Sequence, residues 1–115
     1  MSEQDLTGEL AGKVAIVTGG GRGIGRRTAL SFARFGADVV IAGRHAENLE
    51  STRQEVEALG VKCLAQPTNI RDLEQVEALV EASVERFESI DYLINNAGGQ
   101  FPARPTEISD RGWRA

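Results

Sequence analysis

The sequence contains very little cysteine, histidine and tryptophan, each of which occurs once in 115 residues. The single cysteine, Cys63, excludes an internal disulfide and is typical of a chain in a reducing cytoplasm, so we expect a cytoplasmic protein. Its side chain is expected to be a small, buried apolar group. The single histidine, His45, cannot build a metal site by itself, so no metal is expected.

Long apolar runs and an excess of positive charge are also missing. No apolar segment approaches the roughly 20 residues of a membrane span, and the polar N-terminus (residues 1–5) has no basic region leading into an apolar one, so no signal peptide is expected. The net charge of −4 argues against nucleic acid or an anionic membrane as partner. With 41% hydrophobic and 26% charged residues, the composition indicates one soluble globular domain.

After a polar lead-in (residues 1–9), strand-like and helix-like segments alternate. Short β-branched apolar runs predict buried parallel strands, and amphipathic segments predict helices. The expected strands are Lys13–Thr18, Asp38–Ala42, Val61–Ala65 and Ile90–Ile94, and the expected helices are Ile24–Phe35, Ala46–Leu59 and Asp72–Phe87. The order predicts an α/β fold, in which right-handed crossovers build a doubly wound parallel sheet with three αβα layers.

Side-chain spacing predicts how these helices end and which side chains they bury. Gly36 and Gly60 are expected to close the first two helices, and either Thr68 or Asp72 is expected to cap the third. The apolar side of the first helix comprises Ile24, Ala29, Phe32, Ala33 and Phe35. That of the third comprises Leu73, Val76, Leu79, Val80, Val84 and Phe87.

The segment Thr18–Gly25, TGGGRGIG, joins the first strand to the first helix. A pyrophosphate group binds where backbone N–H groups and the positive end of a helix dipole point at it. Glycines at such a turn allow the sharp bend, the close approach of the phosphate and tight packing of helix on strand. Because a strand precedes the segment and a helix follows it, the segment predicts a dinucleotide-binding loop.

Two motifs make the chain resemble the short-chain dehydrogenase/reductase family. The spacing TGxxxGxG is met by Thr18, Gly19, Gly23 and Gly25, and the sequence NNAG of that family is found at residues 95–98. The spacing TGxxGxxG of the epimerase-like branch is not met. The resemblance implies that residues 1–115 form a single Rossmann-type NADP(H)-binding domain, truncated after its fourth strand. Residues 98–115 would then be a loop and the start of a further helix.

The end of the second strand indicates which nicotinamide cofactor is bound. An acidic side chain there would bind the free 2′-hydroxyl of NAD, but this sequence has Gly43 followed by Arg44. A guanidinium group binds phosphate bidentately, so Arg44 predicts a 2′-phosphate partner. Arg22, in the glycine loop, is similar to a basic residue of NADP-preferring members. NADP(H) is therefore expected in preference to NAD(H).

The resemblance extends to further cofactor contacts. Asn69 and Ile70 stand where family members commonly have Asp-Val against the adenine, and residues 96–98 stand against the ribose. Asn96 can equally be structural, bridging neighbouring strands, and His45 is expected in the loop beside the adenosine site. The residues expected to contact the cofactor are Gly19, Arg22, Gly23, Ile24, Gly25, Arg44, Asn69, Ile70, Asn96, Ala97 and Gly98.

The catalytic residues of the family are not found. The only tyrosine, Tyr92, lies in the fourth strand without a lysine four residues later, and no lysine follows Lys62. We therefore expect the cofactor-binding part of an oxidoreductase that transfers hydride between NADP(H) and a carbonyl, alcohol or enoyl substrate, incompetent by itself. A non-catalytic NADP(H)-binding module and a subunit completed by another chain remain alternatives.

The last residues bear on substrate and assembly. Asn95–Trp113 resembles the enoyl-CoA and dienoyl-CoA reductase branch, in which residues 99–101 would face the substrate, although carbonyl and alcohol substrates are the default expectation. A small-molecule substrate is expected only in a full-length form. A sheet that stops at its fourth strand has an open edge, which favours self-association.

Overall fold

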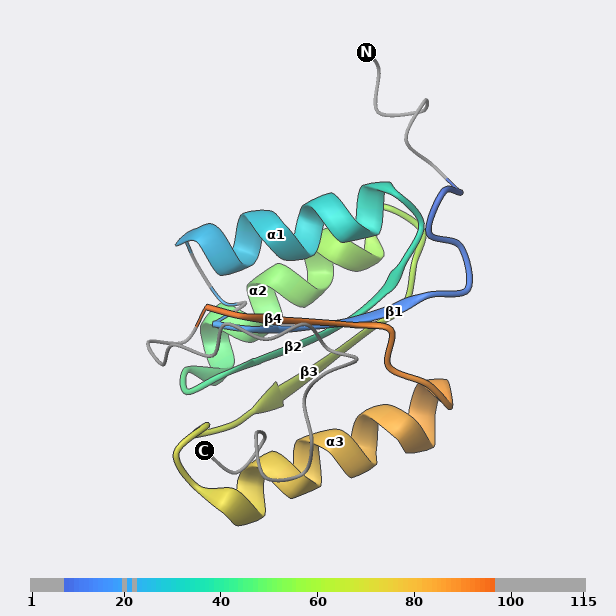
Figure 1. The fold of residues 1–115 in the computed structure, drawn as a ribbon. Coiled ribbons are helices and arrows are strands. Elements are labelled where there is room, and N and C mark those ends of the chain that lie inside the picture. Colours follow the sequence, from blue (N-terminus) through green and yellow to red (C-terminus); the bar gives the residue numbers. More distant parts are fainter. Residues whose placement is uncertain (1–7, 20, 22, 97–115) are drawn as a thin grey trace.

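The computed structural model describes residues 8–19, 21 and 23–96 of the chain. Within them, four strands alternate with three helices: β1 (Val14–Thr18), α1 (Gly23–Arg34), β2 (Asp38–Gly43), α2 (Ala46–Glu57), β3 (Cys63–Pro67), α3 (Leu73–Phe87) and β4 (Tyr92–Asn95). All three strand pairings are parallel, in the order β3-β2-β1-β4. Figure 1 shows α1 and α2 on one face of the sheet and α3 on the other. The expected doubly wound α/β architecture is confirmed.

Both faces of the two central strands are covered, which explains their continuous apolar sequences. Val17, Val39 and Ile41 pack in a cluster with residues of α1 and α2, including Ala29, Ala33, Leu49 and Val56. Ile16, Val40 and Ala42 lie in a second cluster with Leu79 of α3. Neighbouring side chains of a strand point to opposite faces, so β1 and β2 supply both clusters in alternation.

β3 and β4 each begin two residues later than the apolar runs predict. The register pairs Val39 with Cys63 and Gly43 with Pro67, and it pairs Ala15 with Tyr92. β3 therefore continues past Ala65, because strand pairing uses backbone groups rather than apolar side chains, and it ends at Pro67, which has no backbone N–H group.

Carboxylates bond to neighbouring backbone at the amino ends of these strands. The amide of Lys62 donates to Asp38 Oδ1 at 2.9 Å, and the amide of Val14 donates to Asp91 Oδ2 at 2.9 Å. These bonds join two pairs of parallel strands, β2 with β3 and β1 with β4, at the amino ends of the strands.

The helix ends decide between the alternatives that the sequence left open. Asp72 is the N-cap of α3 and accepts from the amides of Glu74 and Gln75, whereas the hydroxyl of Thr68 donates to the carbonyl of Gln66. Gly36 follows α1 with a φ of +98°, as expected for a helix-closing glycine. α2 ends at Glu57, two residues before the predicted end.

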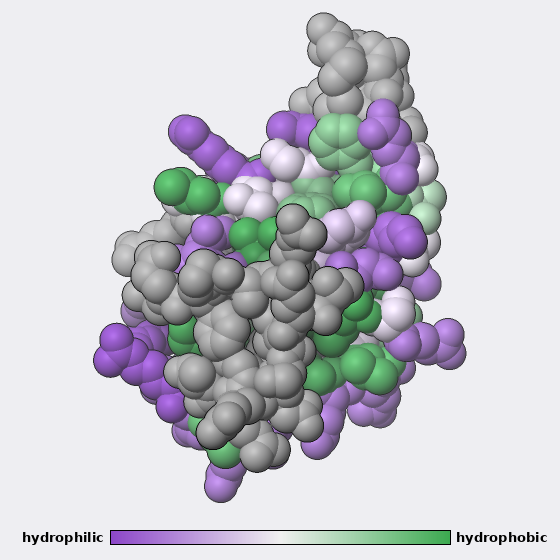
Figure 2. Space-filling model, in the orientation of Figure 1, coloured by the Kyte–Doolittle hydropathy of each residue, from purple (hydrophilic) through white to green (hydrophobic). Residues whose placement is uncertain are grey.

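Three apolar residues predicted on the packed helix faces are exposed. Ile24 is 74% exposed, Leu73 40% and Val84 44%. α1 buries Gly25, Ala29 and Ala33, and α3 buries Val76, Leu79 and Ser83. Successive residues of a helix are rotated by about 100°, so Ile24 and Val84 stand beside the buried stripe rather than on it. Exposed apolar and charged residues are accordingly interspersed on the face seen in Figure 2.

The buried hydroxyl of Ser83 explains why a polar residue can lie on the packed face of α3. It donates to the carbonyl of Leu79 at 2.7 Å, so this hydroxyl group is not left without a partner.

Among the described residues, no helix combines the length and the apolarity that crossing a membrane requires.

Candidate functional site

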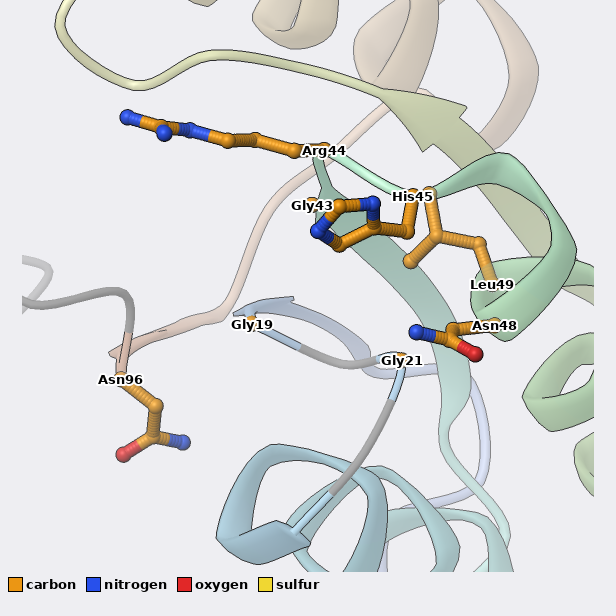
Figure 3. A pocket seen from close by; sticks show the side chains of 8 residues that line it. All are labelled: Gly19, Gly21, Gly43, Arg44, His45, Asn48, Leu49 and Asn96. Atoms are coloured by element: carbon orange, nitrogen blue, oxygen red, sulfur yellow. The ribbon is translucent and has the colours of Figure 1, made fainter.

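A cavity opens where the chain leaves the carboxyl ends of β1, β2 and β4 (Figure 3). Its volume is about 230 Å³, below the roughly 300–1,000 Å³ of sites that enclose a drug-sized ligand. It can therefore hold one part of a dinucleotide, such as a phosphorylated ribose. The cavity is lined by Gly19, Gly21, Gly43, Arg44, His45, Asn48, Leu49 and Asn96.

The glycine loop forms one wall of this cavity. Gly19 adopts a φ of +69°, and its amide donates to the carbonyl of Ala42 at 2.7 Å, which directs the chain across the end of β2. A Cβ atom on Gly19 would lie 3.4 Å from the backbone of Asn96, so the chain passes β4 closely. Glycine suits this position because other residues rarely adopt a positive φ.

α1 begins directly after the loop and carries no acidic residue in its first turn. By contrast, α2 and α3 have Glu47 and Glu74 in theirs. Since a carboxylate in the first turn would compensate the positive end of the helix dipole, α1 leaves that end available to an external anion. Gly23, Ile24 and Gly25 form this turn, but none of the three lines the cavity.

Thr18 ties the end of β1 to the end of β4. Its hydroxyl group donates to Asn95 Oδ1 at 2.9 Å and accepts from the amide of Asn96 at 2.9 Å. The backbone of Asn96 is thus held by a strand-to-strand bond while the residue also lines the cavity. The two roles considered for Asn96 from the sequence are compatible.

Arg44 and His45 follow β2 at the mouth of the cavity, and both are exposed. Figure 3 shows the Arg44 side chain extending away from Gly43, whose lack of a side chain leaves no carboxylate at this strand end. Within the part of the chain that the structure describes, Arg44 forms no ion pair. Its guanidinium group is therefore available to a ligand.

α2 closes the opposite side of the cavity. Thr52 is buried, and its hydroxyl group donates to the carbonyl of Gly21 at 3.4 Å. Arg26 of α1 donates through Nε to Glu55 Oε1 at 2.8 Å, and this hydrogen bond lowers the pKa of the Glu55 carboxyl group. Both side chains are about 40% exposed, so this ion pair between α1 and α2 contributes little to stability.

The structure does not bring Asn69 and Ile70 into this cavity. Asn69 lies between β3 and α3, where its Oδ1 atom accepts from the amide of Arg71 at 3.0 Å and its own amide donates to Gln75 Oε1 at 2.8 Å. These bonds order the turn ahead of the Asp72 cap. The remaining predicted contacts, Arg22, Ala97 and Gly98, lie outside the described residues.

Gly21, Asn48 and Leu49 line the cavity although the sequence analysis did not select them. Gly21 could have been found from its place in the glycine loop. Asn48 and Leu49 carry no recognisable motif, because they come from the first turn of α2 and reach the cavity only through the packing of α2 against the loop.

Cys63 and Tyr92 both take part in packing. Burial of Cys63, whose side chain lies in the core, raises the pKa of its thiol to about 12, so it stays protonated and unreactive at neutral pH. Tyr92 packs against Phe32 with ring centroids 5.4 Å apart. No group of three potential metal ligands occurs in residues 8–19, 21 and 23–96.

Comparison with known proteins identifies relatives of the whole segment. A family model described as short chain dehydrogenase matches residues 13–115. Gluconate 5-dehydrogenase of Gluconobacter oxydans is 43% identical over 116 residues, which cover 98% of this chain and 44% of the relative. Peroxisomal 2,4-dienoyl-CoA reductase of Arabidopsis thaliana is 34% identical over 103 residues, which cover 90% of this chain and 35% of the relative.

Solved structures agree with the fold. A xylitol dehydrogenase with bound NAD+ has a TM-score of 0.77 at 35% identity, covering 81% of this chain and 36% of that one. L-Sorbose reductase of Gluconobacter frateurii, complexed with NADPH and L-sorbose, has a TM-score of 0.75 at 34% identity, covering 91% and 40%. The chain thus spans less than half the length of these relatives, and they differ among themselves in the cofactor bound.

Proposed function

Because the chain belongs to the short-chain dehydrogenase family, we propose that it binds NADP(H) in the cavity between the glycine loop and α2. The observation that carries this proposal is the end of β2. There Gly43 supplies no carboxylate to bind a ribose hydroxyl group, and the exposed guanidinium group of Arg44 follows it at the cavity mouth. Guanidinium pairs bidentately with phosphate, which favours a 2′-phosphorylated adenosine.

The residues around the cavity fit such a cofactor. Backbone amides of the glycine loop and of Gly23–Gly25 would hold the pyrophosphate at the uncompensated end of α1. Asn96, with Ala97 and Gly98 beyond it, would bind ribose, Arg22 would add positive charge, and Asn69 and Ile70 would border the adenine. When bound, NADP(H) supplies or accepts the hydride.

For the whole protein we propose hydride transfer between NADP(H) and a carbonyl, alcohol or enoyl substrate. The dehydrogenase and reductase names of the relatives support this reaction class. The 115 residues themselves contain no tyrosine followed four residues later by lysine. We therefore propose that they bind cofactor without turnover and that the catalytic groups come from elsewhere in the protein or from another chain.

The absence of that tyrosine and lysine also favours a second candidate, a non-catalytic NADP(H)-binding module. The two candidates differ in one measurement. The assay follows NADPH oxidation by the complete protein, including any segment beyond these 115 residues, in the presence of carbonyl and enoyl substrates. Oxidation supports an oxidoreductase, whereas tight NADPH binding without oxidation, whichever substrate is added, supports the module.

Substitution of Arg44→Asp tests the cofactor assignment. We expect the Kd for NADPH to rise by at least about tenfold, because a charge-assisted hydrogen bond worth roughly 1.5–3 kcal/mol is replaced by repulsion. The Kd for NADH should stay the same or fall. Titration of NADPH and NADH fluorescence against the full chain measures both constants.

A matched control is Lys13→Asp, which changes the net charge equally at the opposite edge of the sheet, where Lys13 is exposed. This variant is expected to bind both cofactors as the unaltered chain does. Equal preference for NADPH in the unaltered chain and Arg44→Asp would contradict the assignment to NADP(H).

A further inference from the structure

We propose that Asn48, in the first turn of α2, is a second determinant of cofactor choice beside Arg44 and that its carboxamide meets the 2′ substituent of the adenosine ribose. This inference rests on the proposed NADP(H) site and extends it to a residue that does not belong to the glycine loop. Three observations support it: Asn48 lies against Gly21, its side chain lines the cavity, and its carboxamide has no hydrogen-bond partner among the described residues.

Asn48 stands where a side chain of the glycine loop would otherwise stand. A Cβ atom built on Gly21 would lie 2.9 Å from the Cβ atom of Asn48, closer than two such atoms can approach. Thr52, four residues along and on the same face of α2, bonds to the carbonyl of Gly21 at 3.4 Å. α2 is therefore held against the loop, and Asn48 rather than residue 21 supplies the side chain at this part of the cavity wall.

The carboxamide of Asn48 has no hydrogen-bond partner among the described residues. Three other polar side chains of α2 are half-buried like Asn48, namely Arg53, Glu55 and Glu57, and all three are hydrogen-bonded. Arg53 bonds to Glu50 and to Glu57, and Glu55 bonds to Arg26. The backbone amide of Asn48 donates to the carbonyl of His45 at 3.1 Å, and the side chain forms no hydrogen bond with the described residues. Figure 3 shows the side chain over Gly21, between the loop and His45.

The chemistry of a carboxamide suits a phosphorylated ribose. It offers two N–H donors and carries no charge, so it can donate to a phosphate oxygen without repelling the group. A carboxylate in the same place would bind a free 2′-hydroxyl group and repel a phosphate. Asparagine at position 48 therefore admits a phosphate that aspartate would repel, while Arg44 supplies the positive charge.

The direct test is Asn48→Asp in the full chain, with NADPH and NADH titrated by fluorescence. We expect the Kd for NADPH to rise at least about tenfold and the Kd for NADH to stay equal or fall. The matched control is Gln54→Glu, which introduces the same charge further along α2 on an exposed position. The control is expected to leave the ratio of the two constants unchanged.

A second pair of variants tests whether residues 21 and 48 compete for the same space. Gly21→Ser is expected to weaken NADPH binding, because its Cβ displaces the first turn of α2. Addition of Asn48→Gly should restore much of that binding, since the serine hydroxyl can then take the vacated place. The claim that residues 21 and 48 share one space is overturned if the double variant, Gly21→Ser with Asn48→Gly, binds NADPH no better than Gly21→Ser alone while the two have equal melting temperatures without cofactor.

Failure of the proposed function and failure of the role of Asn48 give different results. If the unaltered chain binds neither NADPH nor NADH, the proposed function fails and this inference fails with it. If the unaltered chain binds NADPH and Arg44→Asp reverses its preference, but Asn48→Asp keeps the same preference as Gln54→Glu, the proposed function stands and the role of Asn48 is overturned. A reversed preference in both Arg44→Asp and Asn48→Asp supports the two determinants together.

Discussion

Thr18 links the packed sheet to the cavity wall. It is 4% exposed, and its hydroxyl group bonds both to the Asn95 side chain and to the backbone of Asn96. A buried hydroxyl group with two good partners costs nothing to bury, but removing it leaves those partners without the bond.

We expect Thr18→Val to lower the free energy of unfolding by about 1–3 kcal/mol, because the shape is kept while the amide of Asn96 loses its acceptor. Chemical denaturation measures the change. Thr18→Ser, which keeps the hydroxyl group and removes only a methyl group, should cost less. A Thr18→Val variant as stable as the unaltered chain would show that the hydroxyl group does not hold β4 to β1.

The three helices differ in the residues at and around their first turns. α3 satisfies its first amides with the Asp72 side chain. His45, the N-cap residue of α2, makes no capping bond through its side chain, and the first turn of α1 contains no acidic residue. Of the two helices whose N-cap residue is described, α2 and α3, only α3 is therefore capped by a side chain.

Asp72→Ala should destabilise the chain by roughly 1 kcal/mol, because the amides of Glu74 and Gln75 lose their acceptor. Thermal and urea unfolding measure this loss. Asp72→Ser retains an N-cap oxygen and should recover most of it, whereas cofactor binding should be unaffected in both variants. Loss of NADPH binding in Asp72→Ala at full stability would link this cap to the site.

At the scale of the whole molecule, the sheet ends in β3 on one side and β4 on the other. All four residues of β4 are half-buried, and among the described residues no strand pairs with its outer edge. A strand edge without a partner offers backbone N–H and C=O groups to which a further strand can add.

We therefore expect a chain of only these 115 residues to self-associate. Sedimentation velocity over a range of concentrations should show the mean mass rising with concentration, and the melting temperature should rise with it. A sharp melt that does not depend on concentration, with a monomeric mass throughout, would contradict this expectation.

Local rules account for much of what the sequence predicted. Alternating apolar runs and amphipathic segments are set by neighbouring residues, so the order of strands and helices followed from them. β2 was predicted as Asp38–Ala42 and extends one residue further, to Gly43. Segment ends were less accurate, because the pairing register rather than apolarity decides where β3 and β4 begin.

The sequence by itself determined the βαβ order, the glycine loop and the arginine that follows β2, because each depends on residues close together in the chain. Only the tertiary structure decided that Asn48 faces Gly21, that Asn69 bonds within its own turn, and that Ile24 and Val84 are exposed. The contact of α2 with the loop joins residues such as Gly21 and Thr52, 31 positions apart. Packing of helices on the sheet creates such neighbours, and no spacing within a single element encodes them.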